Sequence, residues 1–263
     1  MTGRAVPGAT GAVTPRRGPG PRSVTVAMVS AVVLVVLTLV HLLAQLTGPA
    51  WLREVTQPML LLPLLVVVLA LTPAPRSHTT SWALAAFALS WGGDTVPRFL
   101  VAGGFEAMLA LFALAHVAWI IALWPRRRQT LVWRQPAVAL PFLAYGIVLV
   151  IVCAQGAGSL LPAVILYAAL ILLMAVLAPA LGKVAAIGAL VFILSDSLIA
   201  LREFAGLDLP GQSMWVMLTY VAAQAMLAMG VIRTEGRERV AGGAGAATAA
   251  GATTDSGGAT ASR

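Results

Sequence analysis

The sequence predicts an all-α fold: a polytopic membrane helical bundle of about eight transmembrane helices. Hydrophobic residues make up 60% of the 263-residue chain and charged residues only 10%, whereas a soluble domain carries about 25% charged residues. The apolar residues form stretches close to the roughly 20 residues that a membrane-spanning helix needs. Most basic residues fall in the tails and in the short connections between these stretches, as is typical of multi-pass membrane proteins.

The two ends of the chain differ from its apolar middle. Residues 1–22 are rich in Gly, Pro and Arg, and residues 234–263 are rich in Ala, Gly and Thr. Segments of such composition bury too little apolar surface to fold. We therefore expect a disordered tail over residues 1–22, a transmembrane domain over residues 23–233 and a second disordered tail over residues 234–263. The first apolar run is too long for the core of a signal peptide, so we interpret it as an uncleaved span.

Eight apolar segments account for the predicted helices, and the short connections between them predict antiparallel neighbours. The second and third segments are interrupted by Pro63, by Thr72 and by an expected turn at the sequence SWGGD. In the seventh segment, the small residues Ala185, Gly188 and Ala189 should let a neighbouring helix approach closely. The segments lie near residues 24–46, 57–72, 79–97, 104–124, 132–154, 159–180, 184–203 and 212–232.

The basic residues predict how the chain is oriented in the membrane. Lys and Arg are enriched in the cytoplasmic loops of membrane proteins. If the N-terminus is inside, only Arg53, Arg98 and Arg202 of the 17 Lys and Arg residues fall outside. We therefore expect a multi-pass protein of the cell membrane whose N- and C-termini are cytoplasmic. The same placement argues against nucleic acid as a partner, although the formal net charge is +8.

Two aspartates, Asp94 and Asp196, fall inside apolar segments. A charged side chain at membrane depth costs about 2.5–3.5 kcal/mol and by default marks a functional site. At a helical rise of 1.5 Å per residue, Asp94 lies roughly 22 Å and Asp196 roughly 20 Å from the inner face. The two carboxyl groups are therefore expected at a similar level, in the outer half of the bundle.

Other polar side chains are expected near this level: His116, Ser195, Tyr220 and Gln224. Tyr220 and Gln224 are four residues apart and therefore share one helix face. Each candidate also has a structural interpretation. Asp94 can cap a helix end, Asp196 can serve a hydrogen bond between helices, and His116 or Gln224 can hold neighbouring helices together.

The chain lacks the motifs of several enzyme classes. No nucleotide-binding P-loop, HExxH zinc motif or GxSxG nucleophile motif occurs in it. Its three histidines, His41, His78 and His116, are far apart, and Cys153 is the single cysteine. We therefore expect no metal site, no organic cofactor and no intrachain disulfide.

Five motifs in order resemble those of the YhhN family, the lysoplasmalogenases, over nearly all of residues 24–232. They are LSWGGD, LFALAHVAWI, PAVILYAALILLMAV, IGALVFILSDSLIALREF and MLTYVAAQAMLAMG. The chain departs from the family pattern at Gln57, where a lysine is usual, at Met108, where a glycine is usual, and at Trp119, where a tyrosine is usual. The missing lysine removes a basic group that can meet a phosphate.

The resemblance implies an integral-membrane hydrolase that cleaves the vinyl ether bond of lysoplasmalogen-type lysophospholipids. The products would be a fatty aldehyde and a glycerophospho-alcohol, and the partners are the lipid bilayer and the lysophospholipid. Asp94 and Asp196 would form the acid/base pair, because burial in a low dielectric favours the neutral form of a carboxyl group. The supporting or substrate-binding residues would be His116, Tyr220, Gln224 and Ser195.

Two other classes of function fit the same buried acids. The first is a proton-coupled transporter of a lipid or another solute, in which the aspartates carry protons without hydrolysis. The second is a membrane scaffold in which both aspartates are structural. Release of aldehyde from an alkenyl lysophospholipid, compared with alkyl and acyl analogues, separates the hydrolase from both.

Reporter fusions test the predicted orientation. Reporters fused after Leu71, Trp124 and Ile232 should give an inside signal, and reporters near Gly103 and Gly156 should give an outside signal. This follows because consecutive connections lie on alternating sides of the membrane. An outside signal from the Trp124 fusion would reverse the orientation and move both aspartates to the cytoplasmic half.

Overall fold

The computed structural model describes the backbone of residues 18–255 and the side chains of residues 18–244. The structure is 89% helical and contains no strand in this part of the chain, which confirms the all-α class. Its α-helices are α1 (Pro21–Leu46), α2 (Ala50–Met59), α3 (Leu61–Leu71), α4 (His78–Thr95), α5 (Gly104–Leu123), α6 (Leu131–Arg134), α7 (Leu140–Ala157), α8 (Leu161–Leu177), α9 (Lys183–Ala205) and α10 (Gln212–Asp255). Short 3-10 turns join several of them: η1 (Val96–Phe99), η2 (Trp124–Gln129), η3 (Pro136–Ala139), η4 (Gly158–Leu160) and η5 (Ala178–Leu181).

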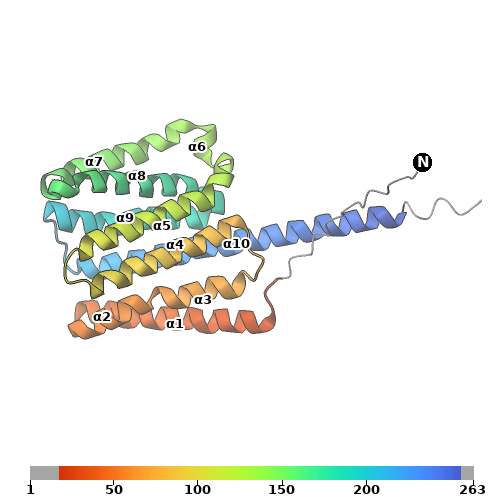
Figure 1. The fold of residues 1–263 in the computed structure, drawn as a ribbon, viewed down its shortest axis with the longest axis horizontal. Helices are drawn as coiled ribbons and strands as arrows, with labels where there is room; N and C mark the ends of the chain where they lie inside the picture. The colour runs from red at the N-terminus through yellow and green to blue at the C-terminus, as the bar shows by residue number, and fades with distance from the viewer. Residues whose placement is uncertain (1–17, 256–263) are drawn as a thin grey trace, which may run out of the picture.

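The helices form one bundle in which consecutive spans run in opposite directions, with α2 and α3 together forming one span (Figure 1). Helices α1, α2 and α3 form one edge of the bundle, and α7 with α8 forms the other. Helix α5 packs against both α4 and α8, while α10 packs along α9 and also contacts α1, α3 and α4. The antiparallel arrangement follows from the short connections, as the sequence predicts.

By length and composition, six helical stretches of the described chain can cross a membrane, which makes this a multi-pass membrane protein. They are Pro21–Leu46, Ala50–Leu71, Gly104–Gln129, Pro136–Leu181, Lys183–Ala205 and Gln212–Ala244. The fourth contains both α7 and α8, which run antiparallel (Figure 1). Helix α4 is less apolar than these six but lies inside the bundle against α3, α5 and α10. If α7 and α8 are counted as separate membrane crossings and α4 is added, the number of crossings agrees with the predicted number of about eight.

The two interrupted segments behave differently from the sequence-based expectation. The second span begins at Ala50, earlier than expected, and is broken at Leu60. Pro63 explains the break, because it has no N–H to bond the carbonyl of Met59. The expected turn at SWGGD is wrong, since α4 continues through both glycines to Thr95. A Cβ on Gly93 would lie 2.7 Å from the ring of Phe112, so this glycine lets α5 pack closely instead of ending the helix.

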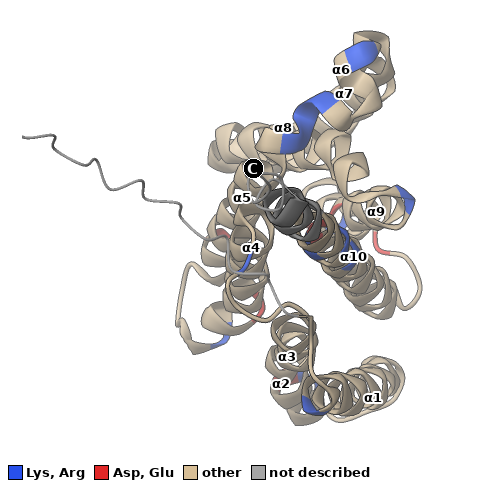
Figure 2. Ribbon diagram, turned by 90° about the vertical axis from the view of Figure 1, so that its right-hand side faces the viewer, with Lys and Arg blue, Asp and Glu red and all other residues tan. Residues whose placement is uncertain are grey.

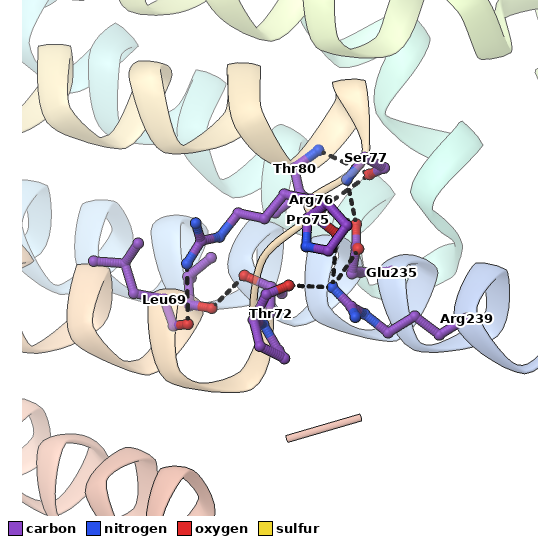
Figure 3. A network of polar contacts seen from close by, with 10 residues as sticks. Leu69, Thr72, Pro75, Arg76, Ser77, Thr80, Glu235 and Arg239 are labelled. Carbon is purple, nitrogen blue, oxygen red and sulfur yellow. Dashed lines mark hydrogen bonds and ion pairs between the residues drawn. The ribbon is translucent and has the colours of Figure 1, made fainter. Parts of the chain in front are cut away.

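The last helix extends beyond the last predicted span. Helix α10 continues without interruption past residue 233 to Asp255, although we expected a disordered tail from residue 234. The start of this extension is held by a buried ion pair between Glu235 and Arg239, in which the Arg239 Nη2 lies 2.9 Å from the Glu235 Oε1. Figure 3 shows Glu235 accepting hydrogen bonds from the Ser77 backbone and, at 2.6 Å, from the Thr80 hydroxyl. The rich supply of alanine beyond this anchor favours helix as well. Residues 1–17 and 256–263 of the expected tails lie outside the described residues.

Basic side chains gather at the end of the bundle where α10 extends outward. Figure 2 views the molecule from this end and shows Lys and Arg on α6, α9 and α10. Arg126 pairs with Glu238 of α10 and donates to the Thr79 hydroxyl at the start of α4. Arg127 stacks over the rings of Trp124 and Trp133, at 4.9 and 5.2 Å. This arginine-rich end is the one that the sequence assigns to the cytoplasm.

Close packing of α9 on α10 confirms the predicted role of the small residues on α9. A Cβ on Gly188 would lie 2.7 Å from the Met226 Cβ and 3.1 Å from the Ala223 carbonyl. On the opposite helix, a Cβ on Gly230 would lie 2.7 Å from the Ala185 Cβ. Each glycine therefore marks a point where the two backbones approach more closely than a larger residue allows.

Substitution of Gly188 by Ala should lower the stability of the bundle. The added methyl group meets backbone atoms of α10, and overpacking of this kind costs about 1–3 kcal/mol. The measurement is thermal unfolding of the purified protein in detergent. Gly236→Ala is the matched control, because its Cβ meets nothing within 4 Å and alanine favours helix. Equal unfolding temperatures for the two variants would contradict the close-packing interpretation.

Candidate functional site

An apolar cavity of about 300 Å³ lies at the end of the bundle opposite the arginines. It is lined by Gln45 of α1, Gln57 of α2 and Asp94 of α4, and by several residues each of α5, α7, α8, α9 and α10. Most of its wall is aliphatic or aromatic, and its volume is at the lower limit for small-molecule sites. The polar residues on its wall are Gln45, Gln57, Asp94, Tyr145, Tyr167, Ser195, Asp196, Ser197, Arg202, Glu203, Ser213 and Tyr220.

Asp94 brings three helices together at one carboxyl group. It lies in the last turn of α4 and is 7% exposed. The Tyr220 hydroxyl, from α10, donates to its Oδ2 at 2.7 Å. The Gln57 side-chain amide, from α2, lies 3.4 Å from its Oδ1. Both oxygens of Asp94 therefore face donors from other helices, which fixes the carboxyl group at the cavity wall.

Arg98 holds this arrangement from behind. Its Nε donates to the backbone carbonyl of Asp94 at 3.0 Å, and its Nη2 donates to the Gln57 Oε1. Its Nη1 pairs with the carboxylate of Glu54. The Gln57 amide is thereby oriented with its oxygen toward the guanidinium and its NH2 toward Asp94. The guanidinium thus acts on Asp94 through the backbone carbonyl and through Gln57.

Asp196 lies in a second polar cluster, formed by α5, α8 and α9. The Tyr167 hydroxyl, from α8, donates to the Asp196 Oδ2 in a short hydrogen bond. The His116 Nε2, from α5, lies 3.2 Å from the Tyr167 hydroxyl and 3.7 Å from the Asp196 Oδ2. His116 is fully buried, whereas the Asp196 side chain is 14% exposed. Asp196 and Tyr167 are therefore the members of this cluster that line the cavity, with His116 behind them.

Two phenylalanines separate the polar clusters. Phe192 meets the His116 ring on one side and the Tyr220 ring on the other, at centroid distances of 5.2 and 5.7 Å. Phe112 meets Tyr220 at 5.7 Å. All three contacts are edge-to-face, the arrangement that aromatic pairs favour. These rings pack against Tyr220 and His116, so apolar groups lie between the two polar clusters.

The structure places the predicted residues in two groups, of which the first lies on the cavity wall: Asp94, Asp196, Ser195 and Tyr220. Within this group, the hydroxyl of Ser195 donates to the backbone carbonyl of Val216 on α10, at 3.1 Å. Ser195 is therefore used in packing α9 on α10, and its role at the cavity is limited to shaping the wall.

The second group, His116 and Gln224, is fully buried and does not reach the cavity wall. His116 lies behind Tyr167, so it contacts the cavity only through that tyrosine. Gln224 lies one turn from Tyr220 on α10, and neither atom of its buried side-chain amide has a hydrogen-bond partner among the described residues. Neither is placed to touch a bound molecule, and His116 is the one of the two with a hydrogen-bond partner on the cavity wall, Tyr167.

Sequence reasoning missed two residues of the site, Tyr167 and Arg98. It also missed that the Gln57 side chain contacts Asp94. Tyr167 offered a signal, because it is a lone hydroxyl in an apolar span and lies at the same level as Asp196. Arg98 lies beyond the end of α4, and only the fold of η1 turns it back onto Asp94.

The arrangement suits proton transfer to and from an amphipathic molecule. Two carboxyl groups line one cavity, each is oriented by a tyrosine hydroxyl, and most of the remaining wall is apolar. Carboxyl groups held in this way serve as general acids and bases. The described residues contain no group of three or more His, Cys, Asp or Glu side chains placed to hold a metal ion.

The model of the YhhN family matches residues 52–231 of the chain. This range begins in α2, ends in α10 and includes both aspartates, both tyrosines and every cavity residue except Gln45. Neither the curated proteins nor the solved structures contain a match to the chain.

Tyr167→Phe should destabilise the protein while keeping its ring in place. The substitution leaves the Asp196 Oδ2 and the His116 Nε2 without their shared hydroxyl partner. Hydrogen bonds between membrane helices contribute about 0.6 kcal/mol on average and up to about 1.7 kcal/mol, and we expect the upper part of this range. Thermal unfolding measures the change. Tyr145→Phe is the control, because Tyr145 is exposed and its hydroxyl donates to Ser197 alone. A Tyr167→Phe protein as stable as wild type would argue against the cluster.

Proposed function

We propose that this chain, which belongs to the YhhN family, is an integral-membrane hydrolase that cleaves the vinyl ether bond of lysoplasmalogen-type lysophospholipids. The observation that carries the proposal is the pair of aspartates, Asp94 and Asp196, on the wall of one apolar cavity. Each accepts a hydrogen bond from a tyrosine on another helix. The family membership supports a hydrolase, and the pair supports acid–base chemistry.

The shape and polarity of the cavity fit a single-chain lipid. The exposed polar side chains of Arg202 and Glu203 line it at the end of α9, whereas α7 and α8 contribute aliphatic wall residues such as Leu149, Val164 and Ile171. An alkenyl chain can lie along this aliphatic wall without leaving an apolar environment. The scissile bond, which joins the chain to the glycerol, then falls between the apolar wall and the polar end, where the two carboxyl groups lie.

The proposed reaction uses one aspartate as acid and the other as base. The acid transfers its proton to the vinyl ether carbon that is not bonded to oxygen, and the electron pair of the double bond forms the new C–H bond. The resulting oxocarbenium ion is stabilised by the ionised aspartate, which also takes a proton from the attacking water. In the breakdown of the hemiacetal, the aspartate that took the water proton gives it to the glycerol oxygen as the C–O bond breaks. The other aspartate takes the proton of the hemiacetal hydroxyl, which releases aldehyde and glycerophospho-alcohol and restores both groups. The logic is that of paired carboxyl groups in glycoside hydrolysis.

The surrounding residues act by holding these two groups. Tyr220 and Tyr167 each fix one carboxyl oxygen, so the carboxyl groups keep their orientation toward the bound molecule. His116 acts through Tyr167 and is therefore a positioning residue. In the membrane orientation that we propose, with both termini cytoplasmic, the cavity lies in the outer half of the bilayer.

Asp94→Asn and Asp196→Asn should each abolish most vinyl ether hydrolysis in folded protein. An amide keeps the size of the side chain but cannot give or take the proton, and a positioned acid or base contributes roughly 10²–10⁴-fold to the rate. The measurement is aldehyde release from an alkenyl lysophospholipid, with alkyl and acyl analogues as substrates that should yield no aldehyde. Asp208→Asn is the matched control, because Asp208 is exposed at the same end of the bundle and does not line the cavity.

The double variant strengthens the test. Because the two groups act in one reaction, it should be hardly slower than the slower single variant. If both single variants keep near-wild-type turnover, the two-carboxyl mechanism is wrong. Proton-driven uptake of a lipid or solute that is lost in the same variants, without aldehyde release, would favour the transporter instead.

A further inference from the structure

The open end of the cavity carries charged side chains that the proposed acid–base chemistry does not use. Arg202 and Glu203 lie near the end of α9, are exposed, and line the cavity. Ser213, in the first turn of α10, lines it beside them. These residues lie beyond Asp196 in the direction of the opening, since α9 runs from the arginine-rich end toward the cavity mouth.

Arg202 is the one basic residue on the cavity wall in the described part of the chain. Its Nη1 donates to the Ser213 hydroxyl at 3.1 Å, and a guanidinium has five N–H donors. Arg98, the nearest alternative, already contacts Glu54, Gln57 and the Asp94 carbonyl and does not line the cavity. The cation at the mouth is therefore Arg202, with Ser213 as a neutral hydrogen-bonding partner at its side.

The separation between Arg202 and Asp196 suits the length of a lysophospholipid. The two residues are six positions apart on α9, which corresponds to roughly 9 Å along the helix axis. A glycerol backbone and one phosphoester bond bridge a gap of this order between an ether oxygen and a phosphate. With the vinyl ether at the aspartates, the phosphate of the same molecule reaches the guanidinium.

Glu203 adds the opposite charge next to this position. Consecutive residues of a helix point in different directions, yet Arg202 and Glu203 both line the mouth. The mouth therefore offers a cation and an anion side by side, which complements a phosphate followed by an ammonium group. An anionic head group without the ammonium would satisfy Arg202 but would place further negative charge or neutral hydroxyls next to Glu203.

We propose that Arg202, Ser213 and Glu203 form a head-group subsite that selects zwitterionic lysophospholipids, with Arg202 and Ser213 binding the phosphate and Glu203 binding the ammonium. The proposal rests on the proposed function for the position of the vinyl ether bond. It assigns the phosphate contact to the end of α9 and the first turn of α10.

Equilibrium binding of unreactive ligands tests the subsite separately from the reaction. Alkyl ether lipids lack the double bond that is protonated, so they bind without turnover. The ligands are a lysophospholipid with a phosphocholine head group, one with a phosphoglycerol head group and an alkylglycerol without phosphate, each measured against purified full-length protein. Wild type should bind phosphocholine most tightly and alkylglycerol most weakly.

Arg202→Gln should weaken binding of both phosphate-bearing ligands by roughly tenfold or more, the range of a charge-assisted hydrogen bond, and leave alkylglycerol binding unchanged. Arg202→Lys should retain most of the phosphate preference, which a purely structural contact with Ser213 does not predict. Glu203→Gln should remove only the preference for phosphocholine over phosphoglycerol. Arg53→Gln and Glu106→Gln are the matched controls, because both residues lie at the same end of the bundle but do not line the cavity.

Three results would overturn the subsite. The first is an Arg202→Gln protein that still distinguishes phosphate-bearing ligands from alkylglycerol as well as wild type does. The second is an equal loss in the Arg53→Gln control, which would reduce the effect to general surface charge. The third is competition by free glycerophosphocholine at the concentrations at which the lipid binds, which would make the ligand a soluble phosphodiester. Aldehyde release is a separate measurement, so its absence would remove the proposed reaction while the binding pattern still decides the subsite.

Discussion

A polar group inside a membrane has no water to bond, and this constraint organises the described structure around its two aspartates. Each carboxyl group must find its donors on another helix, since an unsatisfied group costs several kcal/mol in an apolar medium. Asp94 of α4 meets Tyr220 of α10, and Asp196 of α9 meets Tyr167 of α8. These bonds link helices from both halves of the sequence, and the cavity lies where they meet.

The fold and part of the site could be predicted from the sequence because they depend on simple properties of single segments. Hydrophobic stretches and short connections predict antiparallel spans, and the cost of burying a carboxyl group singles out Asp94 and Asp196. The helical rise predicts that both lie at one level, and both line one cavity. The small residues on α9 predict its close approach to α10, which Gly188 confirms.

The rest depends on contacts that no single segment contains. Glycines read as the turn SWGGD remain helical, because at Gly93 the ring of Phe112 on α5 fills the space that a Cβ would occupy. The extension of α10 is rich in Ala, Gly and Thr, which led us to expect a disordered tail. Its first part is held because Glu235 and Arg239 are buried against the loop before α4 (Figure 3). Tyr167 and Arg98 belong to the site only because the fold brings α8 and η1 beside the two aspartates.

The glycine-mediated contact between α9 and α10 has a consequence for how such a protein can adapt. This tightly packed pair supplies one member of each aspartate–tyrosine bond, the carboxyl group of Asp196 and the phenol of Tyr220. The close contact between the two backbones therefore sets the distance between the Asp196–Tyr167 and Asp94–Tyr220 hydrogen bonds. Part of the aliphatic wall comes from α7 and α8, for example Leu149, Val164 and Ile171, and changes at these positions reshape the cavity without touching the contact between α9 and α10. Under the proposed function, the length of chain that fits can therefore change while the two carboxyl groups keep their spacing.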